Sequence, residues 1–232
     1  RVDSTRVIGE AIAAARRPPR VWLQASTATI YAHRFDAAND EHRGQFGGDE
    51  VGVPALWRRS VEIAQAWEAQ LEAAATPLTR KVAMRSAMVM SPDRGGVFHV
   101  LANLCRAGLG RHGDGRQYVS WIHADDFVAA IRFLIDHDTL AGAVNLAAPA
   151  PLPNREFIAA IHRALGRRLS IPVPAWALEI GAVMLRTETE LILKSRRVVP
   201  TRLQEAGFQF RYREWPAAAV DLVHRMRSNA VR

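Results

Sequence analysis

Cysteine is almost absent from this sequence, and so are long apolar runs. Cys105 is the only cysteine among the 232 residues, which excludes an intrachain disulfide and fits a reducing cytoplasm. Its position inside a predicted helix favours a small buried thiol over a nucleophile. The longest nearly apolar run, residues 175–185, is shorter than the roughly 20 apolar residues that a membrane-spanning helix needs. We therefore expect a cytoplasmic protein that does not cross a membrane.

Lysine is also scarce, although the chain is strongly basic. Lys81 and Lys194 are its only lysines, so nearly all of the net charge of +8 comes from arginine. The arginines are scattered in short pairs, without interleaved aromatic side chains on which bases could stack. This pattern favours a solvated surface over a nucleic-acid-binding one. The expected partners are a small-molecule substrate and a second copy of the chain in a homodimer, with no nucleic acid and no membrane.

Several common site signatures are missing. The eight histidines include no pair three or four residues apart, so no helix-borne metal site is expected. Neither lysine follows a glycine, which excludes a Walker phosphate loop. No Gly-x-Ser-x-Gly motif marks a hydrolase nucleophile. Metal chemistry, nucleotide hydrolysis and serine hydrolysis are therefore disfavoured.

Apolar strands alternate with amphipathic helices along the chain, which is typical of a parallel α/β sheet. Asn154 is a suitable N-cap for a helix that Gly166 ends. A helical region is expected from about residue 150 onward, with breaks near Pro200 and at 207–212. The predicted strands are 21–26, 82–90, 116–122 and 143–147, and the predicted helices are 1–17, 54–75, 96–107, 124–136 and 154–165.

A glycine-rich stretch has the spacing Gly-x-Gly-x-x-Gly at Gly108, Gly110 and Gly113. A dinucleotide-binding fingerprint with this spacing lies between a first strand and a helix, where backbone amides and the helix N-terminus hold the pyrophosphate. Here the glycines follow a predicted helix and lead into a predicted strand. The stretch is therefore not expected to be a phosphate loop.

Other pieces of sequence occur in an order that is specific as a set: Val21–Tyr31, Gly113–Asp126, Asn145–Pro149, and Ser195–Pro200 before Leu203–Phe210. Together they resemble the NAD(P)-dependent epimerase/dehydratase-like proteins of the extended short-chain dehydrogenase/reductase superfamily. More narrowly, the chain resembles the subgroup with an extra helical C-terminal domain.

The resemblance implies an α/β fold with a Rossmann-like parallel sheet over residues 1–150, which forms a partial NAD(P)-binding domain. Residues 151–232 would form a small helical domain on the substrate side. The family's first strands and its glycine-rich loop are absent, so we expect an N-terminally truncated form. NADP or NAD is the implied cofactor, although the loop that binds its pyrophosphate is not in this sequence.

The usual proton relay of the superfamily is a Tyr-x-x-x-Lys pair, in which the lysine lowers the pKa of the tyrosine. The three tyrosines are followed four residues later by Phe35, Ile122 and Pro216, so the relay is missing. Ser26 and Tyr31 remain the best catalytic candidates, because they follow the end of a strand. A strand-end hydrogen bond and a packed ring are the alternative, and the sequence leaves both open.

The resemblance also implies positions for the cofactor and the substrate. Ala25, Ser26, Arg85, Ala87 and Met88 belong to the stretches that run past the nicotinamide. On the substrate side we expect Arg116, Gln117 and Trp121.

Nucleotide-sugar epimerases often carry an arginine before the Asp-Tyr-Ile-His strand, where it binds the diphosphate. The corresponding stretch here reads Val-Ser-Trp-Ile-His and lacks it, which puts a sugar-nucleotide substrate in doubt, although Arg116 is close enough to substitute. His123 is expected to anchor the turn into the next helix. Asp125 and Asp126 suit the start of that helix, where its dipole favours negative charge.

Two functions stay open. One is an NAD(P)-dependent, epimerase/dehydratase-like oxidoreductase of unknown substrate. The other is a non-catalytic dinucleotide-binding or interaction protein that has lost the Tyr-x-x-x-Lys relay.

The C-terminal region, 172–232, carries too many large apolar side chains to remain in water. We expect it to pack over the Gly108–Trp121 side and to help wall a substrate cleft, with Trp121 and Trp176 near the boundary. A separate helical appendage or a dimerisation surface is the alternative.

Overall fold

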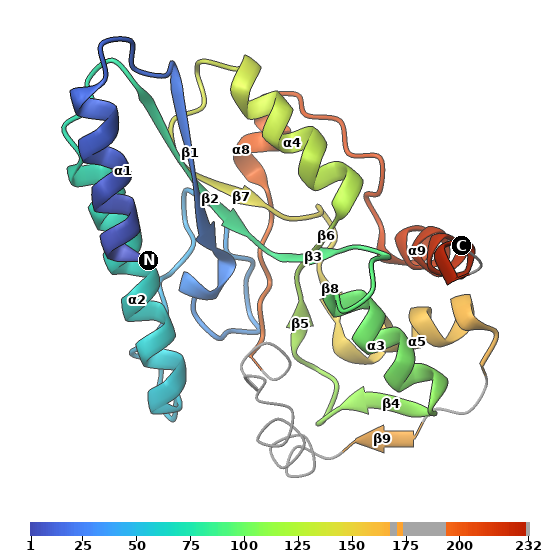
Figure 1. The fold of residues 1–232 in the computed structure, drawn as a ribbon. Coiled ribbons are helices and arrows are strands. Elements are labelled where there is room, and N and C mark those ends of the chain that lie inside the picture. Colours follow the sequence, from blue (N-terminus) through green and yellow to red (C-terminus); the bar gives the residue numbers. More distant parts are fainter. Residues whose placement is uncertain (168–170, 174–193, 231–232) are drawn as a thin grey trace.

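The computed structural model describes residues 1–167, 171–173 and 194–230 (Figure 1). Its main sheet is parallel and has the order β1–β2–β7, formed by β1 (Val21–Thr27), β2 (Arg80–Ser86) and β7 (Gly142–Leu146). The predicted α/β fold with a parallel sheet is confirmed.

Helices cover both faces of this sheet (Figure 1). On one face, α1 (Val2–Ala14) and α2 (Ala55–Ala73) pack over Trp22 and Ala83. On the other, α4 (Ala124–Asp136) packs over Val82 and Val144. Successive residues of a strand face opposite sides, so a strand covered on both faces is apolar throughout rather than alternating.

The predicted strand 82–90 is wrong in one respect, because it is two strands. At Ala87 the chain passes from the main sheet to a second pair: the Ala87 N–H donates to Leu146 O, whereas the Met88 N–H donates to Ser120 O. Beyond this point β3 (Met88–Met90) pairs in parallel with β6 (Trp121–His123). The change of partner carries the chain from the main sheet to the C-terminal half of the molecule.

The predicted strand 116–122 is also divided. Ser120 separates β5 (Tyr118–Val119) from β6, and its hydroxyl donates to Arg196 O and accepts the Val198 N–H. β5 pairs antiparallel with β8 (Leu152–Pro153). A strand inside the glycine stretch, β4 (Leu109–His112), was not predicted because its sequence is short, polar and glycine-rich; it pairs in parallel with β9 (Ile171–Val173).

Helices α3 (Val97–Arg106), α5 (Asn154–Leu165) and α9 (Trp215–Ala230) complete this second half (Figure 1). The predicted N-cap role of Asn154 is wrong, because Pro153 occupies that position. The Asn154 side chain instead accepts the backbone N–H of His112 at 2.8 Å. It ties the start of α5 to the end of β4.

The described residues of the C-terminal segment pack back onto the body, which confirms that part of the prediction, and a role in walling a substrate cleft stays a prediction. Leu203, in α8 (Thr201–Glu205), and Phe208 are buried beside α4. Trp215 at the start of α9 stacks on Phe157, with ring centroids 4.1 Å apart, and meets Trp121 edge-on. Trp176 and the other apolar residues between 174 and 193 lie outside the described residues.

Cys105 is buried in α3, and burial raises the pKa of its thiol to about 12. The predicted small buried thiol is therefore confirmed. Within the described ranges no helix is long and apolar enough to cross a membrane.

Candidate functional site

The C-terminal ends of the three strands of the main sheet meet at one edge. The register pairs Ser26 of β1 with Arg85 of β2, and Arg85 with Asn145 of β7. Three polar residues therefore lie in one row across the sheet, at the edge where α/β folds bind ligands. Such a row is unusual inside an otherwise apolar parallel sheet.

The carboxylate of Glu68 on α2 binds two residues of this row. Arg85 donates from Nε to Glu68 Oε1 at 2.9 Å and from Nη2 to Oε2 at 2.7 Å, which is a two-bond ion pair. Ser26 Oγ donates to the same Oε1 at 2.5 Å. Burial lowers the pKa of Arg85, but Glu68 and Tyr31 more than offset this and hold it above its ordinary value. Arg85 therefore stays charged in the buried site.

Tyr31 lies on the other side of the guanidinium. Its phenolic oxygen accepts a hydrogen bond from Arg85 Nη1 at 2.9 Å and donates to Asn145 Oδ1 at 2.9 Å. The residue is 1 % exposed. Burial raises the pKa of the phenol, and the adjacent Arg85 cation acts in the opposite direction. The hydroxyl is thus held neutral, with both hydrogen-bonding roles filled.

The loop after β1 is attached to this row by further polar contacts. Glu41 Oε1 accepts the Asn145 N–H at 2.8 Å, and burial raises the pKa of this carboxyl. Asn145 Nδ2 donates to Val199 O at 3.0 Å, and Lys194 Nζ donates to Thr29 O at 2.9 Å. The segment around 194–199 therefore fastens the loop over the strand ends.

The structure brings Ser26, Tyr31 and Arg85 together but disperses the remaining predicted cofactor residues. Ala25 is exposed on β1, and Ala87 is buried in the same apolar cluster as Tyr31. Met88 faces a different space, a cavity beneath α3. Their placement does not test whether they bind a cofactor, so that role stays a prediction.

The predicted substrate residues also lie apart. Arg116 is exposed in the turn before β5, where its N–H donates to Asp114. Gln117 is buried and donates from Nε2 to His112 O at 3.0 Å. Trp121 is fully buried against Trp215. Arg116 is the one of the three that solvent reaches freely.

Glu68 and Glu41 were missed as site residues by the sequence reasoning. Glu68 sits mid-helix, and only the packing of α2 against the sheet brings it to Arg85 and Ser26. Glu41 lies in a loop whose path no periodicity predicts. No short-range sequence pattern marks either carboxylate as a site residue.

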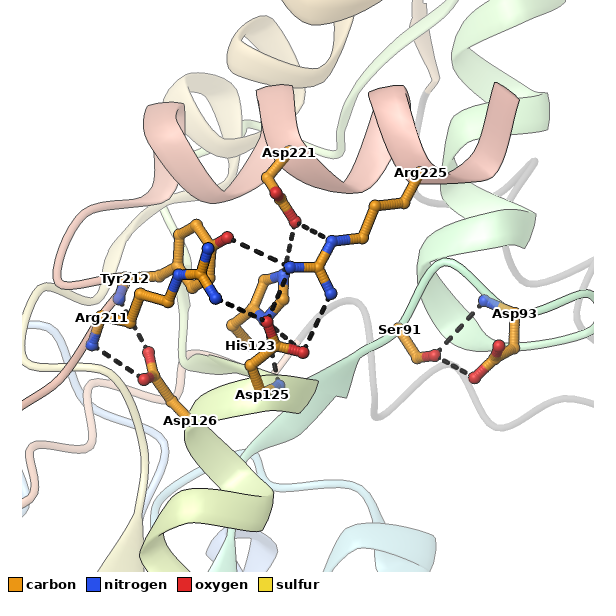
Figure 2. A network of polar contacts seen from close by, with 9 residues as sticks. All are labelled: Ser91, Asp93, His123, Asp125, Asp126, Arg211, Tyr212, Asp221 and Arg225. Carbon is orange, nitrogen blue, oxygen red and sulfur yellow. Dashed lines mark hydrogen bonds and ion pairs between the residues drawn. The ribbon is translucent and has the colours of Figure 1, made fainter. Parts of the chain in front are cut away.

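A second polar network joins the start of α4 to α9 (Figure 2). His123 accepts the Asp125 N–H at Nδ1, so its Nε2 carries the proton and faces Asp221 Oδ2 at 3.2 Å. Its ring stacks on Tyr212. Burial lowers the pKa of His123, although Asp125 and Asp221 act in the opposite direction. The prediction that His123 anchors the turn into the next helix is confirmed.

The carboxylates at the start of α4 have structural partners too (Figure 2). Asp125 accepts two hydrogen bonds from Arg225, at 3.0 and 2.7 Å, and this pairing holds the pKa of Asp125 below its usual range. Asp126 accepts the backbone N–H groups of Arg211 and Tyr212, each at 2.8 Å. Together they attach the segment that leads into α9. No cluster of three or more metal-ligating side chains occurs within the described ranges.

The fold and the strand-end row define a Rossmann-like α/β protein, and comparisons with known proteins narrow the class. The chain is 31 % identical over 226 residues to human epimerase family protein SDR39U1, covering 96 % of this chain and 72 % of that protein. It is 33 % identical over 213 residues to an epimerase family protein of Mycobacterium leprae, covering 91 % and 64 %. A profile described as a domain of unknown function (DUF1731) matches residues 173–222.

Solved structures of epimerase family proteins resemble this chain as well. A crystal structure of human SDR39U1 (isoform 2) with NADPH has a TM-score of 0.82 at 28 % identity, over 96 % of this chain and 72 % of that one. A nucleoside-diphosphate sugar epimerase from Corynebacterium glutamicum has a TM-score of 0.71 at 25 % identity, over 97 % and 42 %. The chain belongs to the epimerase family that includes SDR39U1, within the extended short-chain dehydrogenase/reductase superfamily. It spans 64 % and 66 % of the length of two mycobacterial relatives.

Proposed function

We propose that this chain is an N-terminally truncated NAD(P)-dependent oxidoreductase of the epimerase/dehydratase kind, with an unknown substrate. The observation that carries the proposal is the row of Ser26, Arg85 and Asn145 at the C-terminal edge of the parallel sheet, in which Arg85 and Asn145 both hydrogen-bond to the Tyr31 hydroxyl. The human relative was crystallised with NADPH, and a dehydratase of the same fold with NAD, which supports a nicotinamide dinucleotide as cofactor.

One end of such a cofactor fits the strand-end row. Ser26 and Arg85 lie at the C-terminal ends of β1 and β2, and we assign the nicotinamide to this edge of the sheet, with Ala25, Ala87 and Met88 as further proposed contacts. The pyrophosphate has no matching cradle within the described ranges, because the glycine stretch follows α3 and enters β4 instead of opening a helix. We propose that a segment preceding Arg1 supplies this cradle. The edge of β1 without a described partner strand and the greater length of the relatives support this.

The nicotinamide group would supply hydride transfer, and the chain would manage the accompanying proton. In this proposal Ser26 Oγ and Tyr31 Oη are the atoms that hold it, and the Arg85 cation takes the electrostatic place of the missing lysine. Arg116, Gln117 and Trp121 remain proposed substrate-side residues. We propose that Arg116, which is exposed, meets a polar group of the substrate, and that the buried Trp121 acts only through packing.

One observation favours a second function, that of a non-catalytic dinucleotide-binding or interaction protein. Tyr31 is almost fully buried, and its hydroxyl already has a donor and an acceptor partner. The chain also lacks the Tyr-x-x-x-Lys pair that would relay the proton. An enzyme that uses Tyr31 must therefore open this network during turnover.

We further propose a cytoplasmic protein that acts on a small molecule as a homodimer and binds neither nucleic acid nor membranes. The single thiol and the scattered arginines support this setting.

Turnover measurements separate the two functions. The chain, extended by its upstream coding sequence, is incubated with NADPH or NADH and a panel of small carbonyl compounds and nucleotide sugars. If the chain is catalytic, we expect it to oxidise the cofactor. Ser26→Ala and Tyr31→Phe should each lower the oxidation rate at least tenfold, whereas Tyr118→Phe, outside the strand-end network, should leave the rate unchanged. Cofactor binding without turnover, or equal rates in all three variants, would reject the catalytic proposal.

A further inference from the structure

A cavity of about 270 Å³ lies between α3, β4, β5 and α5. Its walls are apolar, and they include Val100, Leu104, Val119, Phe157 and Ile158. Among the residues that the structure describes, none that lines the cavity carries a charged side chain. Its volume is just below the roughly 300–1,000 Å³ typical of small-molecule pockets. A ligand that fills it is therefore small and largely apolar.

The side chain of His112 gives this cavity a polar group. His112 lines it and is 2 % exposed. Asn154 Oδ1 accepts the His112 backbone N–H at 2.8 Å, which leaves Asn154 Nδ2 to face the ring Nδ1 at 3.4 Å. Because an amide nitrogen can only donate, Nδ1 accepts, and the ring proton sits on Nε2. No partner for Nε2 occurs within the described ranges.

The ring is neutral at physiological pH. Burial lowers the pKa of His112 to about 4. A neutral imidazole protonated at Nε2 offers one hydrogen-bond donor and no charge. It suits an uncharged oxygen, such as that of a ketone, an aldehyde or an alcohol, better than a phosphate.

The cavity adjoins the strand-end site along the chain. Met88, the first residue of β3, lines the cavity. The preceding residue, Ala87, packs in the same apolar cluster as Tyr31. Two consecutive residues, Ala87 and Met88, therefore link the strand-end site to the cavity.

We propose that this cavity binds a small apolar molecule with one carbonyl or hydroxyl oxygen, which accepts a hydrogen bond from His112 Nε2. The inference rests on the proposed function only where it calls this molecule the substrate. It assigns the substrate to aliphatic or alicyclic carbonyl compounds and their alcohols, instead of nucleotide sugars. A diphosphate would enter a space where no described wall residue offers a cation, and burying an unpaired charge there is costly.

The test measures binding of three probes to the 232-residue chain by ligand-observed NMR. The first is methyl hexyl ketone, and the second is the isosteric alkene in which a methylene group replaces the carbonyl oxygen. The third is UDP-glucose. We expect the ketone to bind roughly threefold to tenfold more tightly than the alkene, which is the worth of one net hydrogen bond. We expect no binding of UDP-glucose in the cavity.

Two variants with the same substitution locate the site. Val100→Phe fills the cavity from its rim, at a residue that is 46 % exposed. Val128→Phe on α4, which is 47 % exposed and away from the cavity, is the matched control. Val100→Phe should lower the affinity for ketone and alkene at least tenfold, and Val128→Phe should change neither.

The role of His112 has its own readout. In the wild-type chain, the Nε2 proton signal of His112 should shift when the ketone binds and should stay in place with the alkene. His112→Phe should abolish the preference for the ketone, and His112→Gln, which restores a side-chain N–H donor, should recover part of it.

Equal affinity for ketone and alkene, an unmoved Nε2 signal, or equal binding by the two valine variants would overturn the inference. Binding of UDP-glucose that displaces the ketone would overturn it as well. Failure of the proposed function looks different, because the ketone would then bind with the predicted preference while the extended chain oxidises no cofactor.

Discussion

Arg85 Nη1 lies 2.9 Å from the phenolic oxygen of Tyr31, and the guanidinium also lies beneath the faces of Tyr31 and Phe46, about 5 Å from each ring centroid. The cation thus holds the tyrosine both through its hydroxyl and through its ring. Glu68 supplies the balancing charge. This triple contact fixes the loop after β1 against the strand ends and defines the shape of the candidate site.

Removal of Glu68 should weaken the fold, because it leaves Arg85 buried without its carboxylate. We expect Glu68→Ala to lower the free energy of unfolding by about 3 kcal/mol, as measured by chemical denaturation. Glu72→Ala, at an exposed position on the same helix, should cost less than about 0.5 kcal/mol. Similar losses in the two variants would show that the pair with Arg85 adds little to stability.

Stability should fall in mild acid because of His112. Its pKa is about 4 in the folded chain and close to the ordinary 6.5 in the unfolded chain, so the unfolded chain binds more protons between these values. The free energy of unfolding should therefore decrease as the pH falls from about 6.5 to 4, by up to about 3 kcal/mol.

The same titration in two variants isolates this histidine. His112→Asn should flatten the pH dependence over that range, whereas His224→Asn, at an exposed position on α9, should leave the slope unchanged. An unaltered slope in His112→Asn would mean that the acid sensitivity arises elsewhere.

Arg225 should hold α9 against the start of α4 through Asp125, and it also pairs with Asp221 within α9 (Figure 2). The side chains are about one-third exposed or less, so Arg225→Ala should cost only about 1 kcal/mol in global stability. Amide hydrogen exchange in α9 should nevertheless rise several-fold. Arg132→Ala on the exposed face of α4 is the control, and equal exchange in the two variants would contradict an anchoring role.

The overall α/β architecture could be predicted because it depends on local periodicity. The helix 124–136 and the strand ahead of it carry their signals within a few residues, and the structure places α4 at those bounds. The division of 82–90 at Ala87 could not be predicted, since it depends on which neighbouring strand accepts each backbone hydrogen bond. β4 escaped notice because edge strands of glycine, arginine and histidine carry no apolar alternation.

The candidate site was predictable only in part. Ser26, Tyr31 and Arg85 lie near strand ends, which is a local signal that α/β topology turns into proximity. The ion pair between Arg85 and Glu68 depends on how α2 packs against the sheet. The cavity around His112 depends on contacts between elements more than 40 residues apart in sequence. Tertiary packing of this kind leaves no short-range pattern.

The central claim is that the strand-end row belongs to a nicotinamide cofactor site whose phosphate loop lies outside this chain. Calorimetric titration with NADPH and NADH, applied to the 232-residue chain and to the chain extended by its upstream coding sequence, tests it most directly. We expect saturable cofactor binding by the extended chain and at least a hundredfold lower affinity for the 232 residues alone. Equally tight binding by the 232 residues would contradict it.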